Sequence, residues 1–149
     1  MKHQVSVILF SNDLSHVMVS PLTQGDLNLL CFPMVYCEPG EGFRTAASRL
    51  TSNAIGIDLE PAGWKGIHQI REHSKPDCVT HFFTAILPEL HSALTLEQDQ
   101  PFWMPVRHLM GIAQKDLLRR DGHTVDATMT YLLPMALLNA TSSFHNMGY

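Results

Sequence analysis

The residues of this chain whose types and spacing could do chemistry lie together in the segment from Glu38 to Arg49. Glu41 follows Pro39-Gly40, a pair that fixes one backbone dihedral and frees the next, so Glu41 is expected at the start of a helix. A carboxylate is favoured there by the free N–H groups and the dipole of the helix. Carboxylates are the ligands that hard divalent cations such as magnesium prefer. Arg49 is expected inside the helix and paired with a carboxylate.

The loop and helix that would position these groups are indicated by the surrounding pattern. An apolar run from Leu27 to Phe32 predicts a strand, which Pro33 ends because proline lacks the backbone N–H, and a turn is expected next. Between Thr45 and Ile55 apolar residues recur at three- and four-residue spacing, which predicts a helix. Gly56 is typical of a helix C-terminus. The sequence therefore predicts strand, loop and helix in direct succession.

This segment resembles the Nudix box, a family motif in which a loop and a helix carry metal-binding glutamates. The residues that keep the family pattern are Glu41, Arg49, Gly56 and Ile57. The residues that depart from it are Val35 in place of the first glycine, Leu50, Thr51, Asn53 and Ala54. Three of these, Leu50, Asn53 and Ala54, replace the glutamates that hold the divalent metals in the family.

The resemblance implies cleavage of a phosphoanhydride bond, usually in a nucleoside diphosphate compound, by a metal-activated water. The metal neutralises phosphate charge and lowers the pKa of its bound water. Here the remaining ligands are Glu38, Glu41 and Asn53, and an asparagine oxygen brings no negative charge. We therefore expect no cofactor or only weakly bound Mg²⁺ or Mn²⁺. If hydrolysis persists, Glu41 is the candidate catalytic residue.

The same resemblance implies a ligand pocket beside the loop that precedes the helix. Tyr36, in this loop, is the aromatic residue expected to contact a ligand, because aromatic residues in strands are more often part of the core. Arg49 is expected to be structural, in an ion pair with Glu41. Arg44 is a pocket candidate, although a solvated helix position explains it equally well. The full set of candidate ligand-binding residues is Tyr36, Glu38, Arg44, Arg71, His73 and Lys75.

The remaining pattern predicts an α/β fold, a Nudix-type α/β/α sandwich with a mixed central sheet. Further strands are expected over residues 4–10, 16–20, 64–72, 78–87 and 102–106, with loops over 21–26, 58–63 and 88–101. Helices are expected over 107–118 and 125–140, separated by a turn at 121–123. Thr124 is the expected N-cap of the last helix, Pro134 should kink or divide it, and the tail from residue 141 should be loosely held.

Composition is consistent with one globular domain over residues 1–149, with 45% hydrophobic and 16% charged residues. The chain start reaches Asn12 and Asp13 too early for a signal peptide, and no apolar stretch is long enough to cross a membrane. A cytoplasmic location is therefore expected. Cys31, Cys37 and Cys78 lack CxxC spacing, which favours reduced thiols over a zinc site.

Charge limits the classes of partner. The formal net charge of -4 gives no general attraction to nucleic acid or to an acidic membrane, so both are unexpected partners. The nine histidines show no metal-binding spacing and are expected mostly at the surface or in packing. A small nucleotide-like ligand remains the expected partner, and the family resemblance also suggests a homodimer.

Three functions from different classes stay open. The first is a binding or regulatory protein that keeps the pocket for a nucleoside diphosphate-type ligand and has little or no hydrolysis; the loss of motif glutamates favours it. The second is a hydrolase whose metal is held by other carboxylates, such as Glu38, Glu41, Glu72, Glu97 or Asp99. The third is an interaction scaffold with an apolar surface formed by Met34, Val35 and Phe43.

Overall fold

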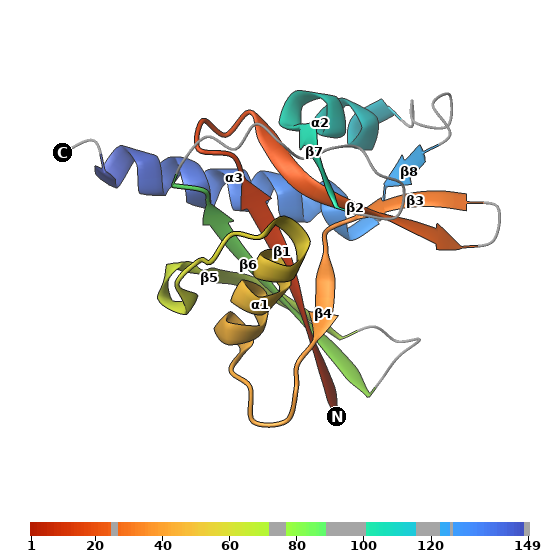
Figure 1. The fold of residues 1–149 in the computed structure, drawn as a ribbon. Helices are drawn as coiled ribbons and strands as arrows, with labels where there is room; N and C mark the ends of the chain where they lie inside the picture. The colour runs from red at the N-terminus through yellow and green to blue at the C-terminus, as the bar shows by residue number, and fades with distance from the viewer. Residues whose placement is uncertain (25–26, 72–76, 89–100, 116–122, 126, 148–149) are drawn as a thin grey trace.

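The computed structural model describes residues 1–24, 27–71, 77–88, 101–115, 123–125 and 127–147 (Figure 1). In chain order the elements are β1 (Lys2–Phe10), β2 (His16–Gln24), β3 (Leu27–Cys31), β4 (Met34–Tyr36), α1 (Phe43–Ile55), the 3₁₀ helix η1 (Pro61–Gly63), β5 (Lys65–Arg71), β6 (Cys78–Ile86), β7 (Phe102–Pro105), α2 (Val106–Lys115), β8 (His123–Val125) and α3 (Ala127–Met147). None of the described helices combines the length and the hydropathy that a membrane crossing requires.

Strand β1 is the central element of the mixed sheet. Among the described strands the order is β5-β6-β1-β2-β3-β8, with β4 paired to β1 and β7 paired to β2. β1 and β6 run parallel along their whole length, from Lys2 opposite Cys78 to Phe10 opposite Ile86. The start of β1 is also antiparallel to β4, with Gln4 opposite Tyr36. The parallel pairing therefore brings the chain start beside residues that follow it by more than 70 positions.

Alternation along β1 divides the core into two layers. Val5, Val7 and Leu9 are buried on the face that packs against α1. Ile8 and Phe10 are buried on the opposite face, in a cluster with side chains of α2 and α3. Figure 1 shows α1 and α3 on opposite sides of the sheet. The predicted α/β/α arrangement with a mixed sheet is therefore confirmed.

Helix α1 is held at its C-terminus and along one side. Gly56 has the left-handed φ of 71°, and its N–H donates to Ser52 O at 2.8 Å, which ends the helix as predicted. Ser48 Oγ donates to Leu59 O at 2.7 Å and accepts from the Nε1 of buried Trp64 at 3.0 Å. These bonds fix η1 and the start of β5 against α1.

The predicted turn is present at Pro39-Gly40, where Gly40 has a φ of 78°, but β4 between Pro33 and this turn was not predicted. Val7 N and Ser6 Oγ both donate to Pro33 O, at 3.0 and 3.1 Å. Pro33 has no N–H to donate, but its carbonyl accepts both bonds and so stays paired with β1. As a result Tyr36 ends a strand instead of lying inside a loop.

Other predicted boundaries are also wrong where long-range pairing decides the conformation. Residues 21–24, expected in a loop, extend β2 and pair with β3. Residues 123–125, expected as a turn, N-cap and helix start, form β8 and pair in parallel with β3. Helix α3 then runs unbroken to Met147, through Pro134 and through most of the tail that was expected to be loose. Residues 89–100 and 116–122, for which a loop, a helix end and a turn were predicted, lie outside the described residues.

The left-handed end of α1 gives a stability prediction. Gly56→Ala places a Cβ on a backbone with φ of 71°, so we expect the free energy of unfolding to fall by about 1 kcal/mol. Gly63→Ala is the matched control, because a Cβ at Gly63 would have no atom within 4 Å and the φ of Gly63 is not in the left-handed region. Urea unfolding measures both variants, and equal effects at the two positions would contradict the proposed role of Gly56.

Candidate functional site

The Glu41 carboxylate lies in a two-bond ion pair with the Arg49 guanidinium. Arg49 Nε donates to Glu41 Oε2 at 2.9 Å, and Arg49 Nη2 donates to Oε1 at 3.0 Å. The Glu41 side chain is only 11% exposed, so solvent screens this pair less than a surface pair. The ion pair between Arg49 and Glu41 that the sequence analysis expected is present.

Two further bonds tie the ion pair to the backbone around it. Arg49 Nη2 also donates to Tyr36 O at 2.9 Å, and Glu38 N donates to Glu41 Oε1 at 3.1 Å. The guanidinium thus connects the end of β4, the following loop and the middle of α1. Both oxygens of Glu41 are engaged, and Oε1 accepts twice.

These contacts set the protonation of the neighbouring groups. The hydrogen bonds from Arg49, together with the Glu38 N–H, hold the pKa of Glu41 below its ordinary value. Glu41 is therefore ionised at neutral pH. Burial, reinforced by the negative charge of Glu41, raises the pKa of the Cys37 thiol. Cys37 is thus kept as a thiol and is not activated as a nucleophile.

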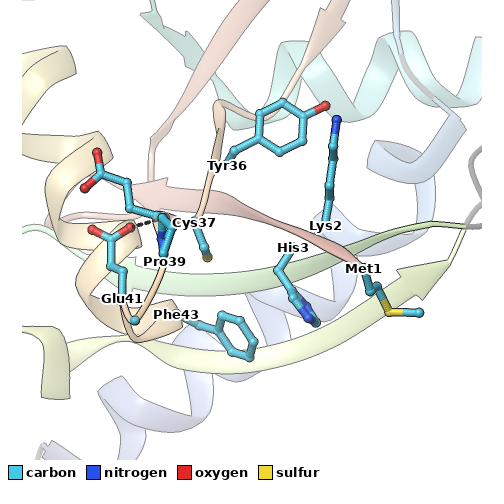
Figure 2. Close-up of a pocket in the computed structure, with 10 residues that line it drawn as sticks. Met1, Lys2, His3, Tyr36, Cys37, Pro39, Glu41 and Phe43 are labelled. Atoms are coloured by element: carbon cyan, nitrogen blue, oxygen red, sulfur yellow. Dashed lines mark hydrogen bonds between the residues drawn. The ribbon is translucent and has the colours of Figure 1, made fainter.

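A pocket of about 510 Å³ opens beside this loop, as Figure 2 shows. The start of β1, the end of β4 and the start of α1 form its walls. Figure 2 shows the rings of His3 and Phe43 on one side, with Tyr36 on another and Glu41 at the loop. The lining residues are Met1, Lys2, His3, Tyr36, Cys37, Glu38, Pro39, Gly40, Glu41 and Phe43.

Three rings form a stacked group at one wall of the pocket. The Phe43 and His81 rings lie 4.0 Å apart at 21°, and the His3 and His81 rings lie 5.2 Å apart at 27°. His3 Nδ1 and His81 Nε2 share a hydrogen bond of 3.0 Å. Sequence reasoning missed this histidine pair because the two residues meet only through the parallel pairing of β1 with β6.

The donor groups at the Nudix-box positions do not fit a magnesium site. Leu50 and Ala54 pack against the apolar cluster beneath α1, and Asn53 is exposed on that helix and does not line the pocket. Glu38 lines the pocket, but Glu41 already uses both oxygens. Within the described ranges no group of three His, Cys, Asp or Glu side chains could hold a metal ion. Magnesium takes near-octahedral oxygen ligands, with one or two carboxylates beside waters and substrate phosphates, and of the two pocket carboxylates Glu41 is already paired with Arg49.

The other predicted ligand-binding residues are only partly brought together. Tyr36 and Glu38 line the pocket, and Tyr36 is 52% exposed. Arg44 lies outside the lining; its Nε donates to Trp64 O at 2.9 Å and its guanidinium lies 5.4 Å from the centre of the Phe83 ring. Arg71 is exposed, and its Nη2 contacts the Sδ of pocket residue Met1 at 3.3 Å. The remaining two candidates, His73 and Lys75, lie outside the described residues.

Solved structures with the same architecture are MutT and Nudix proteins. A MutT/Nudix family protein from Listeria innocua matches with a TM-score of 0.68 and 14% identity over 96% of both chains. An ADP compounds hydrolase matches with a TM-score of 0.60 and 18% identity, over 99% of this chain and 75% of that one. The Nudix domain of Shewanella oneidensis NrtR, solved in complex with ADP ribose, has a TM-score of 0.55 and 14% identity, with 73% and 75% covered.

No protein-family model matches this sequence, and no curated protein matches it. The structural matches are less than a fifth identical to this chain, so they show its fold and nothing more. The chain has a Nudix-like α/β fold.

The ion pair predicts how stability changes with acid. Because the pKa of Glu41 is lowered in the folded protein, its stabilisation is present above the ordinary value near 4.5 and is lost as pH falls through the lowered value. We expect Glu41→Gln to reduce the free energy of unfolding by about 1–2 kcal/mol at neutral pH. The difference from wild type should disappear in strong acid.

Thermal unfolding of both proteins from neutral to acidic pH measures this effect. Glu60→Gln, at an exposed position outside the pocket, is the matched control for the loss of a carboxylate. A difference between wild type and Glu41→Gln that grows with acid would contradict the stabilising role of the ionised pair.

Proposed function

We propose that this chain binds a nucleoside diphosphate-type ligand in the β1–β4–α1 pocket and has little or no metal-dependent hydrolysis. The observation that carries the proposal is the state of Glu41. Its carboxylate accepts three of about four hydrogen bonds open to it, and its charge is balanced by Arg49, which makes it a poor metal ligand and a poor base toward water. The site retains the loop and the helix of a Nudix protein without the donor set for metal.

The pocket itself supports binding of a planar ring joined to an anionic group. Its volume of about 510 Å³ lies within the range of small-molecule sites. Tyr36 and the Phe43–His3 wall offer ring faces for stacking. Lys2 lines the same pocket and can attract phosphate. Two neighbours of the fold add support, namely the NrtR Nudix domain solved with ADP ribose and the ADP compounds hydrolase.

A hydrolase with a rearranged metal site is the alternative that a specific observation favours. Glu38 lines the pocket without an ion pair among the described residues. The further carboxylates that could join it, Glu72, Glu97 and Asp99, lie outside those residues. Such an enzyme would cleave a phosphoanhydride with Mg²⁺ or Mn²⁺, and it would depend on Glu38.

The third reading, a scaffold with an apolar surface, has less support. Phe43 is half-buried in the ring stack and Val35 packs against the core cluster of α1. Met34 is 41% exposed. These three side chains therefore do not present one exposed apolar surface.

The first prediction for this function concerns Glu41→Gln. Glu41 acts through Arg49 and not on the ligand, the amide oxygen of the variant can still accept from Arg49, and Arg49 keeps its bond to Tyr36 O. We therefore expect Glu41→Gln to bind ADP-ribose with an affinity within about threefold of wild type. Calorimetric titration measures the affinity, and Glu60→Gln serves as the control. Complete loss of binding in a folded variant would contradict a pocket that works without metal.

Turnover tests the proposed function against its enzymatic alternative. Phosphate release from a panel of nucleoside diphosphate compounds, with magnesium or manganese, is measured for wild type, Glu41→Gln and Glu38→Gln. We expect no turnover that depends on these carboxylates. Metal-dependent turnover that either substitution abolishes would establish the hydrolase and overturn the proposal.

A second prediction concerns the stacking residue Tyr36. Tyr36→Ala removes an exposed ring, so the variant should fold, and loss of one stacking contact should weaken ADP-ribose binding by about 5- to 100-fold. Tyr131→Ala is the matched control, because Tyr131 is similarly exposed, at 45%, on α3 outside the pocket. Equal affinities for the two variants would place the ligand elsewhere.

A further inference from the structure

The histidine pair at the pocket wall is a group whose charge can change near neutral pH. The Nδ1 of His3 and the Nε2 of His81 lie 3.0 Å apart, so one ring must donate a proton to the other. This bond leaves the Nε2 of His3 as the ring nitrogen that can meet a ligand. His3 lines the pocket, whereas His81 is half-buried, is not part of the lining, and contacts the rings of both His3 and Phe43.

The surroundings favour the uncharged form of His81 in the free protein. Burial, together with repulsion from His3, lowers the pKa of His81. Phe43 packs on its ring without offering charge, and Gln69 of β5 lies opposite it in the sheet. The titratable and charged groups around the pair come from five parts of the chain. They are the Met1 amino group and Lys2 at the start of β1, Tyr36 at the end of β4 with Cys37, Glu38 and Glu41 on the following loop, Arg44 and Arg49 on α1, Arg71 on β5, and Asp77 and Cys78 at the start of β6.

Two carboxylates line the pocket from the loop, Glu38 and Glu41. Glu38 makes no hydrogen bond or ion pair with His3 or His81 within the described part of the chain, and Glu41 is already neutralised. Glu41 is bound to Arg49 by two hydrogen bonds. Its negative charge is therefore offset and cannot stabilise an imidazolium on His3 as a free carboxylate would. An anion that enters the pocket would provide that stabilisation.

We propose that the His3–His81 pair is the anion-binding group of the pocket, and that it takes up one proton when a phosphate group of the ligand binds. This inference rests on the proposed binding function. It explains how the negative charge of the phosphate is balanced without a metal ion. Every bond of the protein and ligand stays intact, and the proton comes from solvent. The group that the histidine pair recognises is a non-bridging oxygen of the ligand's diphosphate.

The complex holds one proton more than the free histidine pair. In the complex His3 carries protons on both nitrogens, with Nδ1–H donating to His81 Nε2 and Nε2–H donating to a phosphate oxygen. His81 stays neutral, with its own proton on Nδ1. Both hydrogen bonds of the imidazolium are then charge-assisted, which makes each of them stronger than the neutral bond of the free pair. His81 acts as a positioning residue through His3 and does not touch the ligand.

The test is the pH dependence of ADP-ribose binding in the presence of a chelator. ADP-ribose is suitable because each of its two phosphates carries one ester and one anhydride bond, so each has one acidic oxygen that stays ionised and does not titrate near neutral pH. Calorimetric titrations at about pH 6, 7 and 8 should show affinity that increases toward acid, by up to about tenfold per pH unit. Titrations in two buffers with different heats of ionisation should show uptake of roughly half to one proton at neutral pH.

The variants separate the pair from general effects of pH. His3→Gln keeps an amide that can donate a hydrogen bond but cannot take up a proton, so we expect its binding to lose both the pH dependence and the proton uptake. His108→Gln, at an exposed position on α2 outside the pocket, should behave as wild type. His81→Gln should also lower the proton uptake. Adenosine, which carries no phosphate, should bind equally at all three pH values.

The outcomes distinguish this inference from the function on which it rests. ADP-ribose binding of equal affinity from acid to alkaline pH would overturn the histidine inference and leave the binding function in place. The same would follow if folded His3→Gln kept the full pH dependence. Absence of binding at every pH would overturn both.

Discussion

The ion pair of Arg49 with Glu41 is the contact on which the organisation of the site depends. It joins three pieces of backbone, namely the end of β4 at Tyr36, the turn at Glu38 and the middle of α1. The loop between β4 and α1 is held to β1 where it begins, by the bond from Cys37 N to His3 O at 2.9 Å, and Arg49 holds its path beyond that point. The same bonds occupy both oxygens of Glu41. The organisation of the loop and the neutralised charge of Glu41 therefore have one physical cause.

The opposite wall depends on the central strand. β1 carries alternating side chains into two cores, and its first residues extend beyond them to reach the pocket. Parallel pairing with β6 places His81 beside His3, and α1 adds Phe43 to the same stack. The pocket thus combines one wall fixed by an ion pair with one fixed by sheet register.

Local signals in the sequence were sufficient for the elements whose conformation is decided locally. The end of α1 at Gly56 was predicted from glycine alone, and the fold class followed from the alternation of strands and helices. β4 was not predicted after Pro33, which lacks an N–H but whose carbonyl still accepts a sheet bond from Val7 N. β8 and the end of β2 depend on pairing with β3, and the His3–His81 contact depends on parallel register between β1 and β6. A single sequence contains no signal for such long-range register.

The central claim is that the pocket binds its ligand without metal, and the affinity for ADP-ribose with and without magnesium tests it most directly. Calorimetric titrations of the wild-type protein are compared in a chelator and in excess magnesium, at one pH and one ionic strength. We expect dissociation constants that agree within about twofold. Binding that weakens by about tenfold or more in the chelator would show that magnesium belongs to the site and would contradict the claim.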